Sequence, residues 1–226
     1  MKHQQYIIAG TLLAITCIFN LKAAAPDSAN NIVINGDMEA WEPVKPNTSP
    51  RPVAKFPENV CLERFDSGVE VPGDDTSLPV GVSIAPDRLQ KHGGDCSARI
   101  ENTEQEQSGG ITLRQIPVEP NTKYLVRVWI KGEDIAVDKD PTHGAVVWVK
   151  YGPEQDFWSS PLTAAKHFVP ETRDGTFPWT KFEFTFDTPE GIALLRVPLQ
   201  LRKATGTVWF DDLEVIPVGK SEVSNF

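Results

Sequence analysis

The stretch Ala204-Thr-Gly-Thr-Val-Trp-Phe-Asp-Asp-Leu-Glu-Val215 decides the fold of this chain. Gly206 predicts a turn, and the residues directly after it, Thr207 to Phe210, are strong strand formers. Asp is depleted in strands, so the adjacent Asp211 and Asp212 predict a bulge, a strand end or a cation site. The stretch therefore predicts a strand with an acidic interruption.

The rest of the chain consists of short runs of alternating apolar and polar residues. These runs are separated by many of the 19 Pro and 16 Gly residues, and no long stretch has the period of an amphipathic helix. This pattern is typical of an antiparallel β-sandwich. The strands that we expect cover residues 31–34, 60–65, 80–84, 97–101, 111–118, 123–131, 145–151, 181–186, 194–201 and 207–215.

A second informative stretch lies near the start, Asn31-Ile-Val-Ile-Asn-Gly-Asp-Met-Glu-Ala-Trp41, where an Asn-Gly turn follows an apolar run. Together the two stretches resemble the first and last strands of secreted carbohydrate-binding modules of the CenC-like type, which are cellulose- and xylan-binding, galactose-binding-like domains. Residues 93–100, 118–132 and 179–187 extend the resemblance in the family's order. It implies an all-β fold, a jelly-roll β-sandwich of two antiparallel sheets, that binds polysaccharide without catalysis.

Residues 1–25 have the features of a secretory signal peptide. A basic start precedes an apolar run from Tyr6 to Leu21, and three Ala residues at 23–25 supply small side chains for cleavage. Cys17 leaves a lipid anchor as a less favoured alternative, because Thr16 precedes it and the apolar run continues after it. We therefore expect a secreted, periplasmic or cell-surface protein with one domain over residues 26–226.

The charge of the chain restricts its partners. A formal net charge of −9 disfavours nucleic acid and anionic membranes. A neutral polysaccharide or oligosaccharide, or a protein, fits better, although local basic residues could still bind an acidic sugar. We expect no transmembrane segment, and any glycan-active enzyme that this chain assists would be a separate protein.

Strand alternation separates an apolar core face from a second, aromatic and polar face in four of the expected strands. Trp rings can cover the apolar face of a pyranose, while Arg, Glu and Gln can hydrogen-bond its hydroxyl groups. If these strands share a sheet, the second face predicts a carbohydrate site, which the resemblance places on a concave surface. The predicted carbohydrate-binding residues are Arg127, Trp129, Trp148, Lys150, Glu183, Arg196 and Gln200.

Two alternatives remain open for this face. The two Trp residues could pack under the long segment 152–178 while the charged groups form ion pairs at its rim. The face could also meet another protein, which would make the chain a jelly-roll interaction or adhesion module. A one-residue slip in register would exchange the two faces of any of these strands.

The resemblance also implies a structural Ca²⁺ that joins the first and last strands. The matching residues are Glu39, Asp211 and Asp212, whose oxygen ligands suit Ca²⁺. The alternative is an acidic cluster that meets solvent or Arg99. Beyond the predicted leader, Cys61 and Cys96 are the only cysteines, and in an exported protein we expect them to form a disulfide, with two buried free thiols as the alternative.

Catalytic motifs are missing from the sequence. His92, His143 and His167 have no metal-ligand spacing, and neither a Gly-x-Ser-x-Gly motif nor a P-loop occurs. Glu183 is the one acid on the aromatic face, where such a residue more often binds a hydroxyl group than serves glycoside hydrolysis. We therefore expect no catalytic residue and rank a small glycan-active enzyme last.

Overall fold

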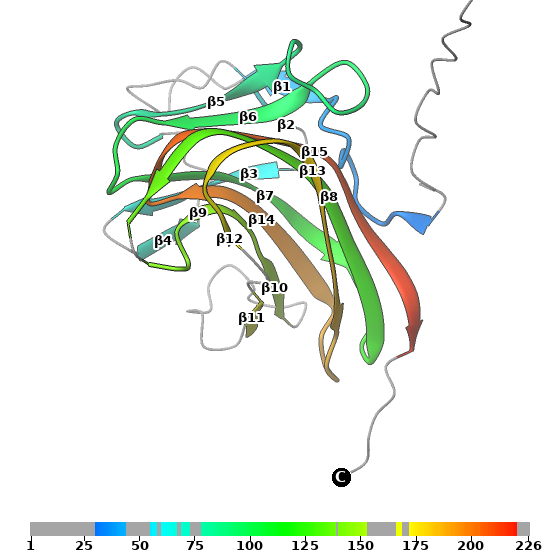
Figure 1. The fold of residues 1–226 in the computed structure, drawn as a ribbon. Coiled ribbons are helices and arrows are strands. Elements are labelled where there is room, and N and C mark those ends of the chain that lie inside the picture. The colour runs from blue at the N-terminus through cyan, green and yellow to red at the C-terminus, as the bar shows by residue number, and fades with distance from the viewer. Residues whose placement is uncertain are drawn as a thin grey trace, which may run out of the picture.

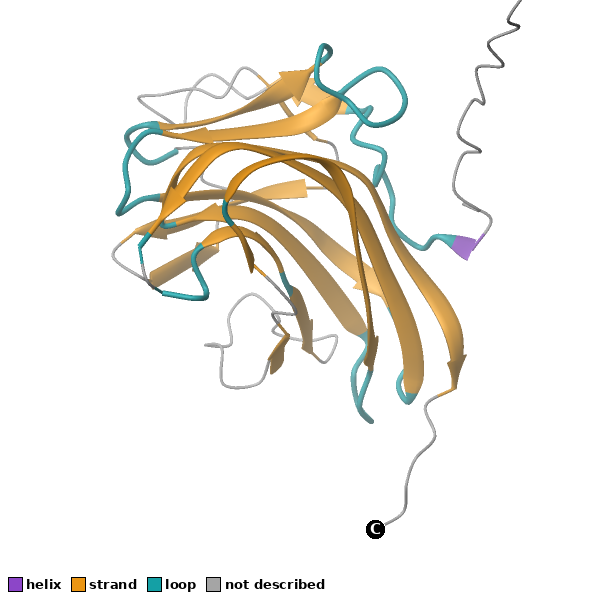
Figure 2. Cartoon of the chain, viewed as in Figure 1, coloured by secondary structure: helices purple, strands orange, loops and turns teal. Residues whose placement is uncertain are grey.

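The computed structural model describes residues 30–43, 55–57, 60–66, 69–72, 78–138, 140–152, 166–168 and 172–220. The predicted signal peptide and Cys17 lie outside these residues. Nearly all of the described chain is strand, turn or loop (Figure 2). In this part of the chain no helix is long and apolar enough to cross a membrane.

The strands form two large antiparallel sheets and one small hairpin-like pair, which confirms the predicted all-β sandwich. The five-stranded sheet has the order β13-β8-β15-β6-β5. Its strands are β5 (Val82–Asp87), β6 (Ser97–Asn102), β8 (Thr122–Val137), β13 (Gly175–Asp187) and β15 (Ala204–Lys220).

The eight-stranded sheet follows the order β11-β10-β14-β7-β3-β4, with β9 pairing both β14 and β12. The two sheets bend in the same direction, and β8, β13 and β15 lie on the outer side of the bend (Figure 1). The eight strands are β3 (Val60–Asp66), β4 (Val69–Pro72), β7 (Ser108–Pro117), β9 (Gly144–Val147), β10 (Val149–Gly152), β11 (Lys166–Phe168), β12 (Thr172–Arg173) and β14 (Leu194–Arg202); β1 (Trp41–Pro43) pairs with β2 (Lys55–Pro57).

The core lies between the two sheets and consists of the apolar rows that alternation predicts. Val126 and Val128 of β8 are fully buried, as are Leu195 and Val197 of β14. Phe182 and Phe186 of β13 join the same cluster. Burying such side chains stabilises the fold by about 1.5–3 kcal/mol each, which makes this cluster the main source of stability.

Most expected strands exist, and the differences have local causes. Residues 31–34 form a loop, but the loop runs beside β15, because Ile32 N donates to Val215 O over 3.0 Å and Leu213 N to Gly36 O over 2.7 Å. The expected strand 145–151 is divided at Trp148 into β9 and β10. The long segment 152–178 contains the short strands β11 and β12.

The acidic interruption of β15 is a bulge, one of the predicted alternatives. Asp211 pairs with Trp129 and Glu214 with Arg127, so one extra residue lies on the β15 side. Asp212 takes up the irregularity with a φ of +48°, in the left-handed region. The two acids therefore belong to a strand that continues beyond them.

The predicted disulfide is not present. Cys96 is a free, buried thiol, and its Sγ donates to the carbonyl oxygen of Met38 over 3.2 Å. Burial raises the pKa of this thiol, and the charge of Glu39 adds to the effect. Cys61 lies on β3, in the other sheet, and its side chain is outside the described residues. The buried-thiol alternative therefore holds for Cys96.

The close contact between Gly36 and β15 generates a stability prediction. A Cβ at Gly36 would overlap the backbone carbonyl oxygen of Leu213, which cannot move without disturbing β15. We expect Gly36→Ala to lower the free energy of unfolding by about 1–3 kcal/mol in urea denaturation. Gly191→Asn is the control, because Gly191 has open space around it and Asn tolerates its φ of +79°. Equal stability of the two variants would contradict this prediction.

Candidate functional site

The seven predicted carbohydrate-binding residues do not share one surface. Arg127 and Trp129 lie on β8 and Glu183 on β13, both in the five-stranded sheet. Of the other four residues, Lys150, Arg196 and Gln200 lie on strands of the eight-stranded sheet. Trp148 lies between its strands β9 and β10, and the Trp148 backbone N–H donates to Pro198 O of β14. The expectation of one common face is therefore wrong, because strand alternation determines the faces of a strand but not the sheet that it joins.

The four residues of the eight-stranded sheet are mostly covered. Lys150 and Arg196 are direct cross-strand partners and are only 3% and 4% exposed, while Gln200 is fully buried. Trp148 is half-buried, and the guanidinium carbon of Arg202 lies 5.0 Å from its ring centroid, a cation–π arrangement. As the chain is folded, these groups present little surface to a ligand.

The three residues of the five-stranded sheet are accessible and held in place. The Arg127 side chain is 25% exposed, and its Nε donates to Glu183 Oε2 over 2.7 Å. Its Nη1 donates to Glu214 Oε2 over 2.9 Å. The hydrogen bond from Arg127 lowers the pKa of Glu183, whose side chain is 37% exposed, so this carboxylate stays ionised at neutral pH.

An aromatic cluster lies beside this ion-pair network. The His92 ring stacks on Trp129 with 3.8 Å between centroids and 15° between planes, and Trp179 meets His92 edge-on at 5.9 Å. Trp129 and Trp179 are half-buried, which leaves part of each indole exposed. We call this surface the Trp129 face; its members are His92, Arg127, Trp129, Trp179, Lys181 and Glu183.

The predicted site set lacked three members of this face, His92, Trp179 and Lys181. Lys181 shares the outward row of β13 with Glu183, and alternation could have found it. Trp179 lies within a family-like segment, which was a usable signal. His92 lies in the loop between β5 and β6, and alternation says nothing about where a loop residue packs. Its position on Trp129 follows from contacts with β15, more than a hundred residues later in the chain.

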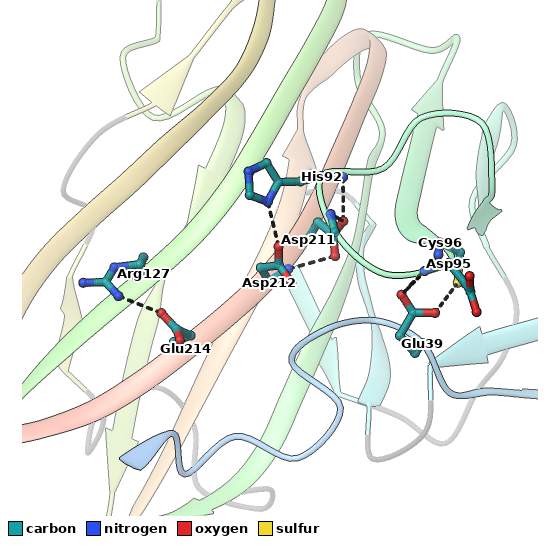
Figure 3. A network of polar contacts seen from close by, with 9 residues as sticks. Glu39, His92, Asp95, Cys96, Arg127, Asp211, Asp212 and Glu214 are labelled. Carbon is teal, nitrogen blue, oxygen red and sulfur yellow. Dashed lines mark hydrogen bonds and ion pairs between the residues drawn. The ribbon is translucent and has the colours of Figure 1, made fainter. Parts of the chain in front are cut away.

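The bulge of β15 anchors the loop that carries His92 (Figure 3). Asp211 Oδ2 accepts from the backbone N–H groups of His92 and Gly93 over 2.8 and 3.1 Å. Asp212 Oδ2 lies 2.6 Å from His92 Nδ1. A Cβ at Gly93 would press on the Asp212 carboxylate, which would have to move away from its present position.

Glu39 anchors the second half of the same loop. Its Oε1 accepts from the backbone N–H groups of Asp95 and Cys96 over 2.6 and 3.2 Å (Figure 3). A Cβ at Gly94 would overlap this carboxylate, and Gly94 also has a positive φ. The three predicted metal-binding acids, Glu39, Asp211 and Asp212, thus share one observed task, which is to hold the 91–96 loop.

This arrangement does not fit the predicted calcium site. Among the described residues, no three His, Cys, Asp or Glu side chains form a group that could hold a metal ion. The oxygens of Glu39 and Asp211 instead accept backbone N–H groups, whose positive ends would repel a cation. The function proposed below therefore includes no step that depends on calcium.

Of the three acids that hold the loop, only Asp211 is buried. Asp211 is fully buried, and this burial raises its pKa to about 7, although the backbone N–H groups of Gly93 and His92 act in the opposite direction. An ordinary Asp pKa of 3.8 applies in the unfolded chain. Between these values the folded protein therefore binds a proton that the unfolded chain releases.

This difference predicts a pH effect on stability. Because folded Asp211 binds more protons than unfolded Asp211, its contribution to the free energy of unfolding should fall as the pH rises from about 4 to about 7. Asp211→Asn keeps the shape and an acceptor oxygen but cannot ionise. We expect the wild type to lose about 2–4 kcal/mol more than this variant over that range, measured by urea denaturation. Parallel pH profiles for the two proteins would contradict the prediction.

Known proteins match this chain in structure but not in sequence. No protein-family model and no curated protein matches the sequence. The enzymatically active domain of tailspike protein 4 of bacteriophage CBA120 is similar over 83% of this chain, with 11% identity and a TM-score of 0.53. This chain covers only 21% of that protein, so the likeness is one of fold alone.

Smaller proteins match over most of their own length. The family 16 carbohydrate-binding module-2 aligns with 61% of this chain and 87% of its own, with 16% identity and a TM-score of 0.43. A CBM4 structure aligns with 82% of this chain and 99% of its own, with 17% identity and a TM-score of 0.42. The chain is similar to carbohydrate-binding modules. At these identities the likeness concerns the fold and does not transfer a ligand.

Proposed function

We propose that this chain is a non-catalytic polysaccharide-binding protein and that its ligand lies on the Trp129 face. This face lies on β8 and β13, on the outer side of the bend, and not on the concave surface that the resemblance implies. The observation that carries the proposal is the position of two half-exposed Trp rings and His92 beside the Arg127–Glu183 ion pair. The family-like motifs from Asn31 to Val215 support the same function class.

The groups of the Trp129 face match the chemistry of a pyranose. An indole covers the apolar C–H face of the sugar and removes that surface from water. Arg127 and Glu183 supply donor and acceptor groups at the edge of the ring. Because Arg127 is fixed by two carboxylates, a sugar that binds there need not order its side chain.

The ion pairs favour a neutral glycan. Arg127 is paired with Glu183 and Glu214, and Lys181 Nζ lies 3.5 Å from Glu183, so the cations of this face are already balanced. The whole chain carries a formal charge of −9, which repels polyanions at long range. Binding should therefore depend weakly on salt concentration.

The state of Glu183 supports a non-catalytic role. A general acid in glycoside hydrolysis must be protonated at the working pH, whereas the hydrogen bond from Arg127 lowers the pKa of Glu183. An ionised, paired carboxylate is suited to accept a hydrogen bond from a sugar hydroxyl group. We propose that any enzyme acting on the bound glycan is a separate protein.

We also propose that the chain acts outside the cytoplasm. The basic start, apolar run and three Ala residues of the first 25 positions motivate this proposal. Mass spectrometry of the mature protein tests it: an N-terminus near Pro26 without a lipid is the expected result. A mature chain that retains residues 1–25, or a lipid on Cys17, would contradict plain signal cleavage.

Two matched Trp variants test the location of the site. We expect Trp129→Ala to weaken binding to the glycan selected from a neutral panel by about 3- to 10-fold, since one ring contact is lost. Trp148→Ala, on the other sheet, should bind like the wild type. Affinity electrophoresis followed by calorimetry measures both, with the thermal midpoint as a check of folding.

The outcomes of this experiment separate the alternatives. Failure of the wild type to bind any glycan would exclude polysaccharide binding and favour the protein-interaction module. Loss of binding only in Trp148→Ala would keep the function but move the site to the eight-stranded sheet.

The absence of catalysis has its own test. Incubation of the protein with the same glycans should release no oligosaccharide products, and Glu183→Gln should leave this result unchanged while it weakens binding. Product release that vanishes in Glu183→Gln would replace the binding proposal with a glycan-active enzyme.

A further inference from the structure

We infer that His92 contacts the polysaccharide directly and that Asp212 is the positioning residue that sets which of its ring nitrogens faces the sugar. This inference rests on the proposed function. It adds a residue that neither the family-like motifs nor strand alternation point to.

His92 is fixed more firmly than a loop residue of purely connecting function requires. Its backbone N–H donates to Asp211, its Nδ1 lies 2.6 Å from Asp212 Oδ2, and its ring stacks on Trp129 at 3.8 Å. These three contacts fix both the position and the orientation of the ring. In spite of these contacts the side chain is 22% exposed.

The contact with Asp212 determines the chemistry of the other ring nitrogen. A carboxylate accepts hydrogen bonds, so Nδ1 carries the proton in this pair. In the neutral imidazole, Nε2 then keeps its lone pair and is an acceptor. Within the described residues Nε2 makes no hydrogen bond, whereas Nδ1 is fully engaged. A sugar hydroxyl group that lies against Trp129 is the kind of donor that Nε2 would accept.

The loop is built to keep this geometry. Glu39 and Asp211 together bind four backbone N–H groups of residues 92–96. At Gly94 the backbone is so close to Glu39 that a Cβ would overlap the carboxylate, and a Cβ at Gly93 would press on the Asp212 carboxylate. Preorganisation of this kind lowers the entropic cost of binding, because the loop need not be ordered by the ligand.

A purely structural role for His92 is the competing explanation, and two variants separate the explanations. His92→Phe keeps an aromatic ring on Trp129 but removes both nitrogens. Asp212→Asn keeps the shape of the anchor but offers an amide that can also donate to Nδ1. We expect each to weaken glycan binding by about 3- to 10-fold, the effect of losing one hydrogen bond, with thermal midpoints near that of the wild type. Asp37→Asn, an exposed acid on the loop before β1, is the matched control and should bind normally.

A direct readout is the ¹⁵N spectrum of the His92 imidazole in the full chain. At a pH at which the imidazole is neutral, we expect the proton on Nδ1 and the lone pair on Nε2, and the neutral glycan selected from the panel should shift Nε2 more than Nδ1. In Asp212→Asn the single tautomer should be lost. A structural role alone would not shift Nε2 when the glycan is added.

The possible failures are distinguishable. Binding of a glycan without a response at Nε2, or with wild-type affinity in His92→Phe, would overturn this inference and leave the proposed function intact. If His92→Phe unfolds, the ¹⁵N response of the wild type still decides. Absence of binding to every glycan would overturn both the proposed function and this inference.

Discussion

The rest of the structure depends on which side chains of β15 face the core and which face outward. In a regular strand successive side chains alternate between faces, so the two acids at 211 and 212 cannot both point outward. Phe210, Leu213 and Val215 are all fully buried in the core, although the spacing from Phe210 to Leu213 is odd. The bulge between Asp211 and Glu214 resolves this conflict by adding one residue to β15 opposite β8. Without it, either Leu213 and Val215 or Phe210 would face solvent.

The same bulge links the fold to the candidate site. It directs the carboxylates of Asp211 and Asp212 toward one loop, where they hold the backbone and ring of His92. Glu214, after the bulge, returns to the outward face and fixes Arg127. One irregularity in β15 therefore positions both the aromatic and the ionic part of the Trp129 face. The site depends on β15 as well as on β8, which carries Arg127 and Trp129.

The sequence allowed the core to be predicted better than the site. Alternation is a local property, so the buried rows that include Val126, Phe182 and Leu195 could be identified from each strand alone. Sheet membership is set by pairing between distant segments, and alternation carries no information about it. For this reason Trp129 and Trp148 were expected on one surface, although β8 and the strands on either side of Trp148 belong to different sheets. The disulfide prediction failed similarly, because the usual state of cysteines in exported proteins does not tell whether two thiols meet.

The acidic pair illustrates how one pattern can serve two chemistries. Carboxylates that are close in sequence can bind a cation if carbonyl oxygens surround them. If N–H groups surround them, they accept hydrogen bonds and hold a loop in place. The sequence shows where the carboxylates are, but it does not show whether the backbone near them presents carbonyl oxygens or N–H groups. Here Gly93 and Gly94 allow the loop backbone to approach until its N–H groups reach Asp211 and Glu39. Burial still penalises the charge of Asp211, and its raised pKa is the consequence. The protein thus holds a partly unfavourable carboxyl group at the point where the loop must be fixed, which is understandable if the position of that loop matters for binding.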